Sequence, residues 1–316
     1  MKSFLVTGGA GFIGSWLVRE LLQREVERVY VLDDLSSGRV KNIQGLSGVE
    51  FLQHSILDNL ETVIPFKELS GVFHLAAKGD VQESIDDPLL YTNVNICGTQ
   101  NILEACREHQ LPFLMTSTCM VYGLNNLQDS GLKNGIHEKH PAIPISPYGA
   151  SKLAAENLAI SYHYAYNLPV RLARPFNTYG PHQKVDNKEG GVIPIFLKRK
   201  QENQNLTVYG SGEQRRDFLY VKDCANFLAQ YFFAETAPLI LNAGSGKSIS
   251  ILELAQMVSD NSLEIQFESH PHPRSEVMEL LCDSSLVKDS LGWSPKFSLQ
   301  EGLRENYEWL EKENES

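Results

Sequence analysis

A chain of 316 residues, 42% of them hydrophobic and 21% charged, carries a formal net charge of −11. This length suits one large or two modest domains, and the composition excludes a mainly disordered chain or a coiled coil. The acidic balance lacks the basic footprint of a nucleic-acid-binding protein. No apolar run reaches the about eighteen residues that a membrane span requires.

The cysteines and the N-terminal segment bear on redox state and location. The five cysteines are Cys97, Cys106, Cys119, Cys224 and Cys282. Their spacing fits no zinc site, so we expect no metal. An odd number without close pairs favours reduced thiols and a cytoplasmic protein. The apolar part of the N-terminal segment is too short and too glycine-rich for a signal peptide, and it predicts a strand and a turn.

The first thirty or so residues predict a strand–helix–strand unit. Residues 2–7 form a short apolar run, and after a glycine turn apolar residues recur at helical spacing from Phe12 to Leu21. Residues 28–32 form a second strand, which ends at Asp33. A unit of this kind indicates a parallel sheet.

The alternation of strands and helices continues along the chain. We expect strands at 71–75, 113–117 and 169–173 and helices at 89–109 and 148–166. This repeated pattern predicts an α/β fold with a Rossmann-type doubly wound parallel sheet.

After Arg174 the strict alternation lapses, and Pro, Gly and Asn become frequent. A strand followed by a helix is expected again at 218–233, and a last helix after the turn at 293–295. We therefore predict an NAD-binding domain over 1–174, to which the chain returns at about 215–240, and a smaller, discontinuous α/β substrate domain over 175–316. The crevice between two such domains is the expected ligand site.

Three glycines follow the first strand. Gly8, Gly11 and Gly14 form a G-x-x-G-x-x-G motif between strand and helix, where the backbone can approach a pyrophosphate and the helix N-terminus offers free N–H groups. Asp33 ends the next strand, about 20 residues on, where a carboxylate binds a ribose 2′-hydroxyl and repels a 2′-phosphate. The motif therefore predicts NAD rather than NADP, with a structural turn as the alternative.

Tyr148 and Lys152 stand four residues apart in an expected helix, so both lie on one face. An ammonium and a nicotinamide ring favour the phenolate of a tyrosine, whose ordinary pKa of about 10 is too high for a base at neutral pH. Such a phenolate can take the proton of a sugar hydroxyl. A Tyr-x-x-x-Lys motif alone is a common chance match. Here it follows residues 116–123, a Ser/Thr-rich segment after a strand, where doubly wound folds bind ligands.

At this point the chain resembles a known family, the extended short-chain dehydrogenase/reductases, which include the NAD-dependent sugar-nucleotide epimerases and dehydratases. The resemblance covers nearly the whole chain. The segments that carry it are TGGAGFIG at 7–14, HLAA at 74–77, NICGT at 95–99, STCMVYG at 117–123, SPYGASK at 146–152, RPFNTYGP at 174–181, GSGEQRRDFLYVKD at 210–223 and LGWSPK at 291–296.

The resemblance implies a role for several residues. Thr118 would bind the sugar O4, Tyr148 would be the base, and Lys152 would hold Tyr148 and the nicotinamide ribose. The implied cofactor-binding residues are Gly8, Gly11, Phe12, Ile13, Gly14, Asp33, Asp34, Ser55, Ile56, Leu75, Ala76, Ala77, Asn95, Tyr148 and Lys152. Ser55 replaces the Asp that is usual near the adenine, and Asp34 stands where Asn is commoner.

The resemblance also assigns the substrate diphosphate. Asn177 and Arg216 would bind it, with Arg274 as a second arginine whose spacing to the next acid differs by one from the family's. The substrate is then a nucleotide-sugar, with uridine favoured over thymidine. Family members usually form homodimers through the exposed face of the helix at 148–166.

The residues after Thr118 bear on which reaction follows the shared oxidation at C4. The 4,6-dehydratases resembled here carry Asp and Glu, whereas this chain has Cys119 and Met120. Met has no titratable group, so the usual C5 base is absent. A 4-epimerase needs neither acid nor base there. We therefore favour 4-epimerisation of a UDP-hexose or UDP-N-acetylhexosamine.

Several alternatives stay open. A 4,6- or 5,6-dehydratase acting on a UDP-GlcNAc-like substrate would use Cys119 as an acid at O6 and some other base at C5. A UDP-uronic acid decarboxylase is disfavoured by Met120, and a 4-keto reductase using NADPH by Asp33. Both Cys119 and Met120 can also be ordinary packing residues. A protein that binds both ligands without turnover would not need the Thr118–Tyr148–Lys152 set.

Overall fold

The computed structural model describes residues 2–123, 135–185, 191–269 and 276–314. Its centre is a seven-stranded sheet with the strand order β11-β6-β5-β4-β1-β2-β3, in which every neighbouring pair is parallel. The strands are β1 (Ser3–Thr7), β2 (Arg28–Leu32), β3 (Val49–Leu52), β4 (Leu69–His74), β5 (Phe113–Thr116), β6 (Val170–Pro175) and β11 (Ile240–Ala243).

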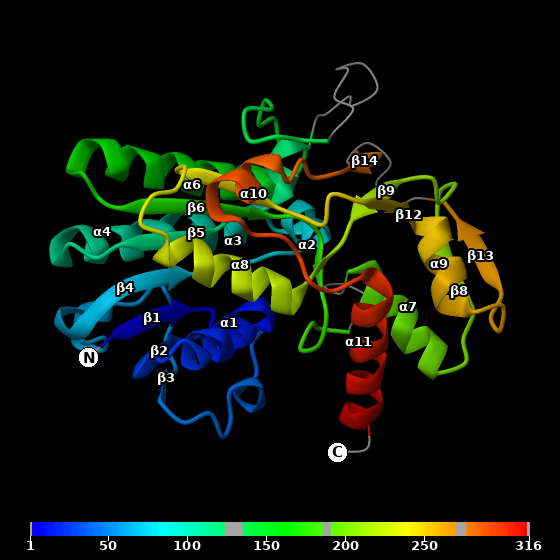
Figure 1. Cartoon of the computed structure of the whole chain (residues 1–316), viewed down its shortest axis with the longest axis horizontal. Coiled ribbons are helices and arrows are strands. Elements are labelled where there is room, and N and C mark those ends of the chain that lie inside the picture. The colour runs from blue at the N-terminus through cyan, green and yellow to red at the C-terminus, as the bar shows by residue number, and fades with distance from the viewer. Residues whose placement is uncertain (1, 124–134, 186–190, 270–275, 315–316) are drawn as a thin grey trace.

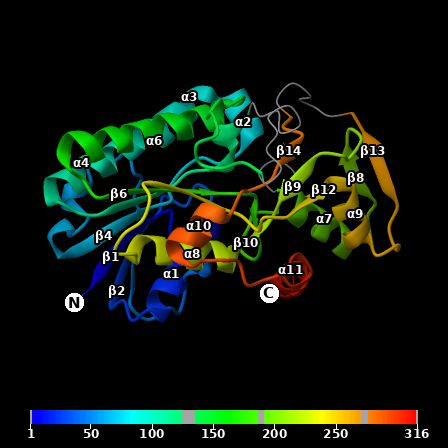
Figure 2. The ribbon, with the colours of Figure 1, turned by 45° about the horizontal axis from the view of Figure 1, so that its top comes forward.

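Helices cover both faces of this sheet (Figures 1 and 2). In Figure 2 one layer lies above the sheet and contains α2 (Val81–Asp86), α3 (Pro88–Tyr91), α4 (Thr99–His109) and α6 (Pro147–Tyr166). The layer below contains α1 (Phe12–Gln23), α8 (Val221–Phe233) and α10 (Ser285–Leu291). This arrangement confirms the predicted doubly wound parallel sheet.

Each face of the sheet has its own apolar core. Along β1 the side chains alternate: Phe4 and Val6 belong to the core under α1 and α8, whereas Leu5 belongs to the core under α4 and α6. In β2, Val29 and Tyr30 divide in the same way. The alternation follows from the period of two in a strand, and burial on both faces explains why these strands are continuous apolar runs.

A second group of elements lies beside the carboxyl ends of the strands, to the right in Figure 1. It has a separate apolar core that includes Phe196, Val208 and Leu254. Its helices are α7 (Val192–Gln201), α9 (Ile251–Ser259) and α11 (Leu299–Asn314), and its strands are β7 (Thr178–Tyr179), β8 (Leu206–Tyr209), β9 (Arg215–Asp217), β10 (Leu219–Tyr220), β12 (Ser248–Ser250), β13 (Ile265–Glu268) and β14 (Glu279–Leu280). The boundary between domains at residue 174 stays a prediction, although α8 and β11 do pack on the central sheet.

The helix expected at 89–109 differs from the expectation. The turns after α3 widen into a π-helix over Thr92–Gly98 before α4 begins. The wide segment places the Asn95 side chain against the loop after β4, and a side chain at Gly98 would clash with Ile56. Such π-helical turns often occur at functional sites, and apolar periodicity does not reveal them.

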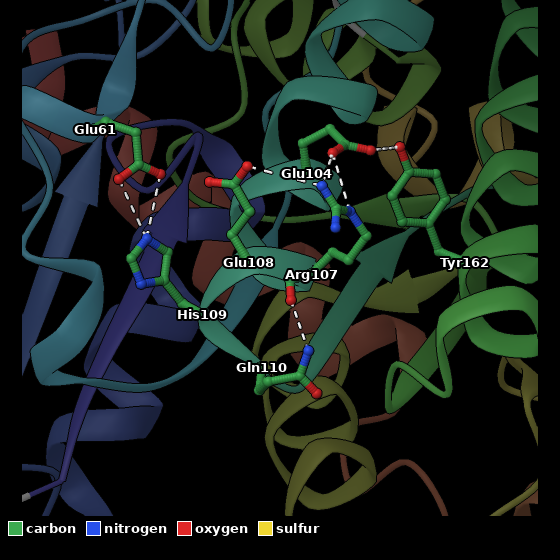
Figure 3. Close-up of polar contacts among 7 residues, drawn as sticks. All are labelled: Glu61, Glu104, Arg107, Glu108, His109, Gln110 and Tyr162. Atoms are coloured by element: carbon green, nitrogen blue, oxygen red, sulfur yellow. Dashed lines mark hydrogen bonds and ion pairs between the residues drawn. The ribbon is translucent and has the colours of Figure 1, made fainter.

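Side-chain bonds join α4 and α6, as Figure 3 shows. Glu104 accepts hydrogen bonds from Arg107 at 2.6 and 3.0 Å and from the Tyr162 hydroxyl of α6. We call Glu104, Arg107 and Tyr162 the outer triad. Both charged side chains are partly exposed, at 41% for Glu104 and 34% for Arg107.

No helix in the described part of the chain is both long and apolar enough to cross a membrane. All five cysteines lie in that part and are free thiols.

Candidate active site

A cleft of about 570 Å³ opens at the carboxyl ends of the central strands. It brings together most of the site residues predicted from the sequence. Those that line it are Gly8, Gly11, Phe12, Ile13, Gly14, Asp33, Asp34, Ile56, Leu75, Ala76, Ala77, Thr118, Cys119, Tyr148, Lys152 and Asn177. The carboxyl edge of a doubly wound sheet is the usual ligand site in such folds.

The glycine loop after β1 packs closely against its neighbours. Gly8 has φ of +68°, and a Cβ there would lie 2.7 Å from the Ala76 nitrogen. A Cβ at Gly14 would overlap the Gly8 carbonyl oxygen. Gly11 caps α1 without a side-chain hydrogen bond from any described residue, so the first N–H groups of α1 are free for a ligand. This cradle fits a diphosphate.

Asp33 lies at the end of β2 and is held by the backbone. Its two carboxylate oxygens accept hydrogen bonds from the N–H groups of Ala10, at 3.0 Å, and Leu35, at 2.9 Å. Burial raises the pKa of this carboxyl, and the backbone bonds oppose that effect. A carboxylate has about four acceptor positions, so Asp33 can still accept a bond from a ribose hydroxyl in the cleft.

Two of the implied cofactor residues are not among the lining residues. The Ser55 hydroxyl accepts a hydrogen bond from the Leu57 N–H at 3.2 Å, within its own turn. Asn95 is buried and holds the loop after β4, through bonds of 2.8 and 3.0 Å to the main chain of Lys78. Its amide also donates to Ser151 of α6, at 2.9 Å. Asn95 therefore does not line the cleft itself but holds the main chain of Lys78, which does.

Thr118 and Tyr148 meet where two elements begin. Ser146 caps the start of α6 by accepting a hydrogen bond from the Gly149 N–H at 3.1 Å, which fixes Tyr148 in the first turn. Thr118 caps the short 3₁₀ helix Cys119–Tyr122. Burial raises the pKa of Tyr148 to about 12, and the neighbouring Thr118 side chain acts in the opposite direction.

Lys152 lies one turn after Tyr148 and is buried at the cleft wall. Burial lowers the pKa of its ammonium to about 8, although the nearby carboxylate of Glu156 acts in the opposite direction. His74, at the end of β4, bonds Thr7 at 2.8 Å and Thr99 at 2.9 Å. Burial lowers the pKa of His74 to about 3, so it is neutral and has the structural role expected of a packed histidine.

The cleft also contains Cys119 and Met120. Burial raises the pKa of the Cys119 thiol to about 12, so it is protonated at neutral pH and cannot serve as a base there. Met120 has no titratable group. The two residues therefore supply no base at the position after Thr118, where the 4,6-dehydratases that this chain resembles carry a carboxylate.

Asn177 is at the cleft, and its amide donates to the Asp217 carbonyl at 3.0 Å. Arg216 is not among the lining residues. It pairs with Glu276 and donates to the Val277 carbonyl at 2.6 Å, close enough to Cys119 to influence that thiol's charge. Arg274 lies outside the described residues.

The sequence did not single out several polar residues that line the cleft. Asp80 and Glu83 follow β4, and Glu83 accepts a 2.8 Å bond from Tyr91, whose ring lies edge-on to Tyr148 with centroids 6.2 Å apart. His182 bonds Ser15 at 2.8 Å through Nδ1. These residues come soon after the segments HLAA and YGP in the sequence. Such segments follow strand ends, where ligands bind, so this position was the signal that could have identified the residues.

Buried polar atoms at the cleft also indicate a ligand. The hydroxyl oxygens of Thr116 and Ser117 and the amide oxygen of Gln183 have no hydrogen-bond partner within the described part of the chain. Buried polar groups are nearly always bonded, so such groups in a cleft fit a polar ligand. Together with the glycine cradle and Asp33, they fit a dinucleotide.

A doubly wound sheet with this cleft and a Tyr–Lys helix defines an enzyme of the extended short-chain dehydrogenase/reductase class. The family model described as GDP-mannose 4,6 dehydratase matches residues 5–306, so the chain belongs to that family. The resemblance inferred from the sequence motifs is thereby confirmed.

Several named relatives match the chain over almost its whole length. A Methanocaldococcus jannaschii protein provisionally named UDP-glucose 4-epimerase is 35% identical, over 98% of this chain and 99% of that one. The structure of Pal from Bacillus thuringiensis is 43% identical with a TM-score of 0.91, covering 98% of this chain and 99% of that one. The Thermus thermophilus UDP-glucose 4-epimerase in complex with NAD is 33% identical, with a TM-score of 0.87 and coverages of 98% and 99%.

Other matches are named as UDP-glucuronic acid decarboxylases, dTDP-glucose 4,6-dehydratases and an NDP-hexosamine 5,6-dehydratase. The chain is thus a nucleotide-sugar enzyme of a family that contains epimerases, dehydratases and decarboxylases.

Proposed function

We propose that this protein is a nucleotide-sugar 4-epimerase that uses tightly bound NAD. The observation that carries this proposal is the combination of Thr118, Tyr148 and Lys152 in one cleft with a protonated Cys119 and an apolar Met120. The first three residues suit the removal and return of a proton at a sugar hydroxyl. The last two leave the sugar C5 without the base that the 4,6-dehydratases resembled by this chain carry.

NAD supplies the group that accepts and returns a hydride at C4 of the sugar. Tyr148 takes the proton of the C4 hydroxyl, and the neighbouring Thr118 hydroxyl is proposed to bind the same oxygen. Lys152 provides a positive charge that favours the phenolate. When the sugar turns and presents its other face, Tyr148 returns the proton and the configuration at C4 is inverted.

The substrate's nucleotide part is proposed to be uridine diphosphate, as in the named UDP-glucose epimerases. Asn177, which lines the cleft, is proposed to bind the diphosphate together with Arg216. We further propose a cytoplasmic homodimer. The exposed Tyr164 and Tyr166 of α6, 77% and 49% exposed, support a second subunit on that helix.

A dehydratase is the second candidate, and it has one observation in its favour. Glu83 is a carboxylate on the wall of the same cleft, next to Tyr91 and Tyr148. In this alternative Cys119 protonates the leaving O6 and Glu83 takes the C5 proton. A uronic acid decarboxylase is less favoured because the acidic wall at Asp80 and Glu83 would repel a sugar carboxylate.

Incubation of the purified protein with UDP-glucose, UDP-GlcNAc and UDP-glucuronic acid, followed by proton NMR, distinguishes these reactions. A new H4 coupling pattern without loss of atoms supports the epimerase. A methyl or exocyclic-alkene signal identifies the dehydratase instead, and release of CO₂ from UDP-glucuronic acid identifies a decarboxylase. No change in any of the three sugars contradicts the proposal for UDP-linked substrates.

A further inference from the structure

A buried ion pair lies directly behind the proposed catalytic residues. Glu156 of α6 is fully buried, and Arg174 of β6 is 4% exposed. The guanidinium donates to both carboxylate oxygens of Glu156, with Nε to Oε1 at 2.9 Å. This two-pronged geometry is the strongest arrangement available to an Arg–carboxylate pair.

The pair extends to a tyrosine. Arg174 donates through its remaining terminal nitrogen to the Tyr122 hydroxyl at 2.6 Å, and its guanidinium lies 4.8 Å from the centre of the Tyr122 ring. The Tyr122 hydroxyl in turn donates to Asn242 of β11 at 3.0 Å. We call Glu156, Arg174 and Tyr122 the buried triad.

Each member of the buried triad is separated from a site residue by only a few positions in the sequence. Glu156 comes four residues after Lys152 on α6, and Tyr122 comes four residues after Thr118 at the end of the 3₁₀ helix. Arg174 comes three residues before Asn177. The triad therefore joins the three segments that carry the proton-handling and diphosphate-binding side chains.

We propose that Glu156, Arg174 and Tyr122 form a positioning unit, which fixes Thr118 relative to Lys152 and keeps a negative charge beside the Lys152 ammonium. The four-residue spacing places the Glu156 carboxylate one helical turn from Lys152, on the same face. Arg174 remains charged at every accessible pH, and it pairs with the Glu156 carboxylate in the buried interior. The turnover part of this inference rests on the proposed function, whereas the charge part does not.

The charges around Lys152 support this role. The titratable and charged groups around it are Tyr148 and Glu156 on its own helix, His74 on β4, and Arg174 behind Glu156, while Asp80 and Glu83 line the same cleft. His74 is neutral, and Glu156 is the anion that acts on the charge of Lys152. Burial alone would favour the uncharged amine, and Glu156 opposes that tendency. Removal of this carboxylate therefore lowers the pKa of Lys152 further below about 8.

The outer triad is a matched control, because it has the same three residue types. Glu104, Arg107 and Tyr162 (Figure 3) also connect to α6, but Glu104 and Arg107 are partly exposed and none of the three lines the cleft. Glu104→Gln and Glu156→Gln thus remove the same kind of charge from similar partners. Water and salt screen the outer charge, whereas the buried charge acts at short range.

Two readouts test the proposal. The first is the rate at which a small acylating reagent modifies Lys152 as a function of pH, followed by peptide mass spectrometry in the absence of substrate. The second is the pH profile of turnover. For Glu156→Gln we expect the modification midpoint and the basic limb of the profile to move down by about one pH unit. For Glu104→Gln we expect both to stay in place.

A loss of folding in Glu156→Gln is addressed by a second variant. The double variant Glu156→Gln with Arg174→Gln removes both charges and avoids an unpaired buried guanidinium. We expect the double variant to fold and to show a smaller downward shift of the modification midpoint. We expect Glu156→Asp to move the basic limb of the pH profile part of the way back toward its native position. A uniform loss of turnover at every pH, with an unchanged modification midpoint, would overturn the inference. If the midpoint shifts and no UDP-sugar turns over, the positioning unit stands and the proposed function fails.

Discussion

The two ends of the cleft are built from different parts of the polypeptide. The cofactor end consists of backbone: the glycine loop packs against Ala76, and Asp33 is held by two N–H groups. The sugar end consists of side chains from separate segments, with Thr118 and Tyr148 meeting across two helix starts. A short motif determines backbone geometry, whereas reaction chemistry depends on single side chains. The family can therefore keep one cofactor end and vary its reactions at the other.

The comparison predicts that a defect at the sugar end leaves the cofactor end intact. Tyr148→Phe removes the proposed base, and we expect turnover to fall by about 10²–10⁴-fold, the usual contribution of a positioned acid or base. NAD affinity should stay close to that of the native protein, as measured by calorimetry. Tyr162→Phe on the same helix is the control, because that hydroxyl bonds Glu104 and does not line the cleft. Equal losses in both variants would show that the effect is structural.

A defect at the cofactor end should have the opposite signature. Gly8→Ala places a side chain at φ of +68° and 2.7 Å from the Ala76 nitrogen, a strain of about 1–3 kcal/mol. We expect weaker NAD binding and a lower melting temperature. Gly79→Ala is the control, since Gly79 also lines the cleft but no described atom lies within 4 Å of an added Cβ. Thermal shift with and without NAD measures both variants, and unchanged NAD affinity in Gly8→Ala would contradict the cradle.

Asp33 should decide which dinucleotide binds. Asp33→Asn removes a charged acceptor, and we expect about a tenfold loss of NAD affinity together with a gain of NADP binding. Asp86→Asn should leave both affinities unchanged, because that side chain is exposed, bonds Gln82 and does not line the cleft. Titration of each variant with both cofactors checks this. Preference for NADP in the native protein would contradict the assignment of Asp33.

The smallest effect is expected at Cys119. In the proposed 4-epimerase its protonated thiol takes no part in proton transfer, so Cys119→Ser should change turnover by less than about threefold, far below the usual acid–base contribution. Initial rates of 4-epimerisation measure this. A loss approaching a hundredfold would indicate an acid at O6 and favour the dehydratase.

Much of the fold was predictable because the central strands are buried on both faces. Residues 28–32 form β2 as expected, and 113–117 differs from β5 by one residue. The π-helical segment over Thr92–Gly98 was not predictable from apolar periodicity, because it is a short segment between two α-helical stretches. The final helix follows the turn at 293–295 as expected. The boundaries of the short strands in the second group of elements could not be predicted from the sequence pattern.

At the site, motifs predicted position better than orientation. The glycine loop, Asp33, Tyr148 and Lys152 all line the cleft, since their places relative to strand and helix ends are determined by the fold. Ser55 and Asn95 do not, because local hydrogen bonds turn Ser55 to its own loop and Asn95 to Lys78. The spacing of residues in a sequence cannot show which hydrogen-bond partner a polar side chain has in the folded protein. The buried triad and Glu83 were missed for the same reason.

Transfer of the hydrogen at C4 is the central claim, and its fate gives the most direct test. UDP-glucose and UDP-GlcNAc labelled with deuterium at C4 are incubated with the protein in ordinary water, and the products are examined by NMR. The account predicts slowed turnover and a product with inverted configuration that keeps deuterium at C4. Exchange of the label with water, or a product whose C4–deuterium bond was never broken, would contradict it.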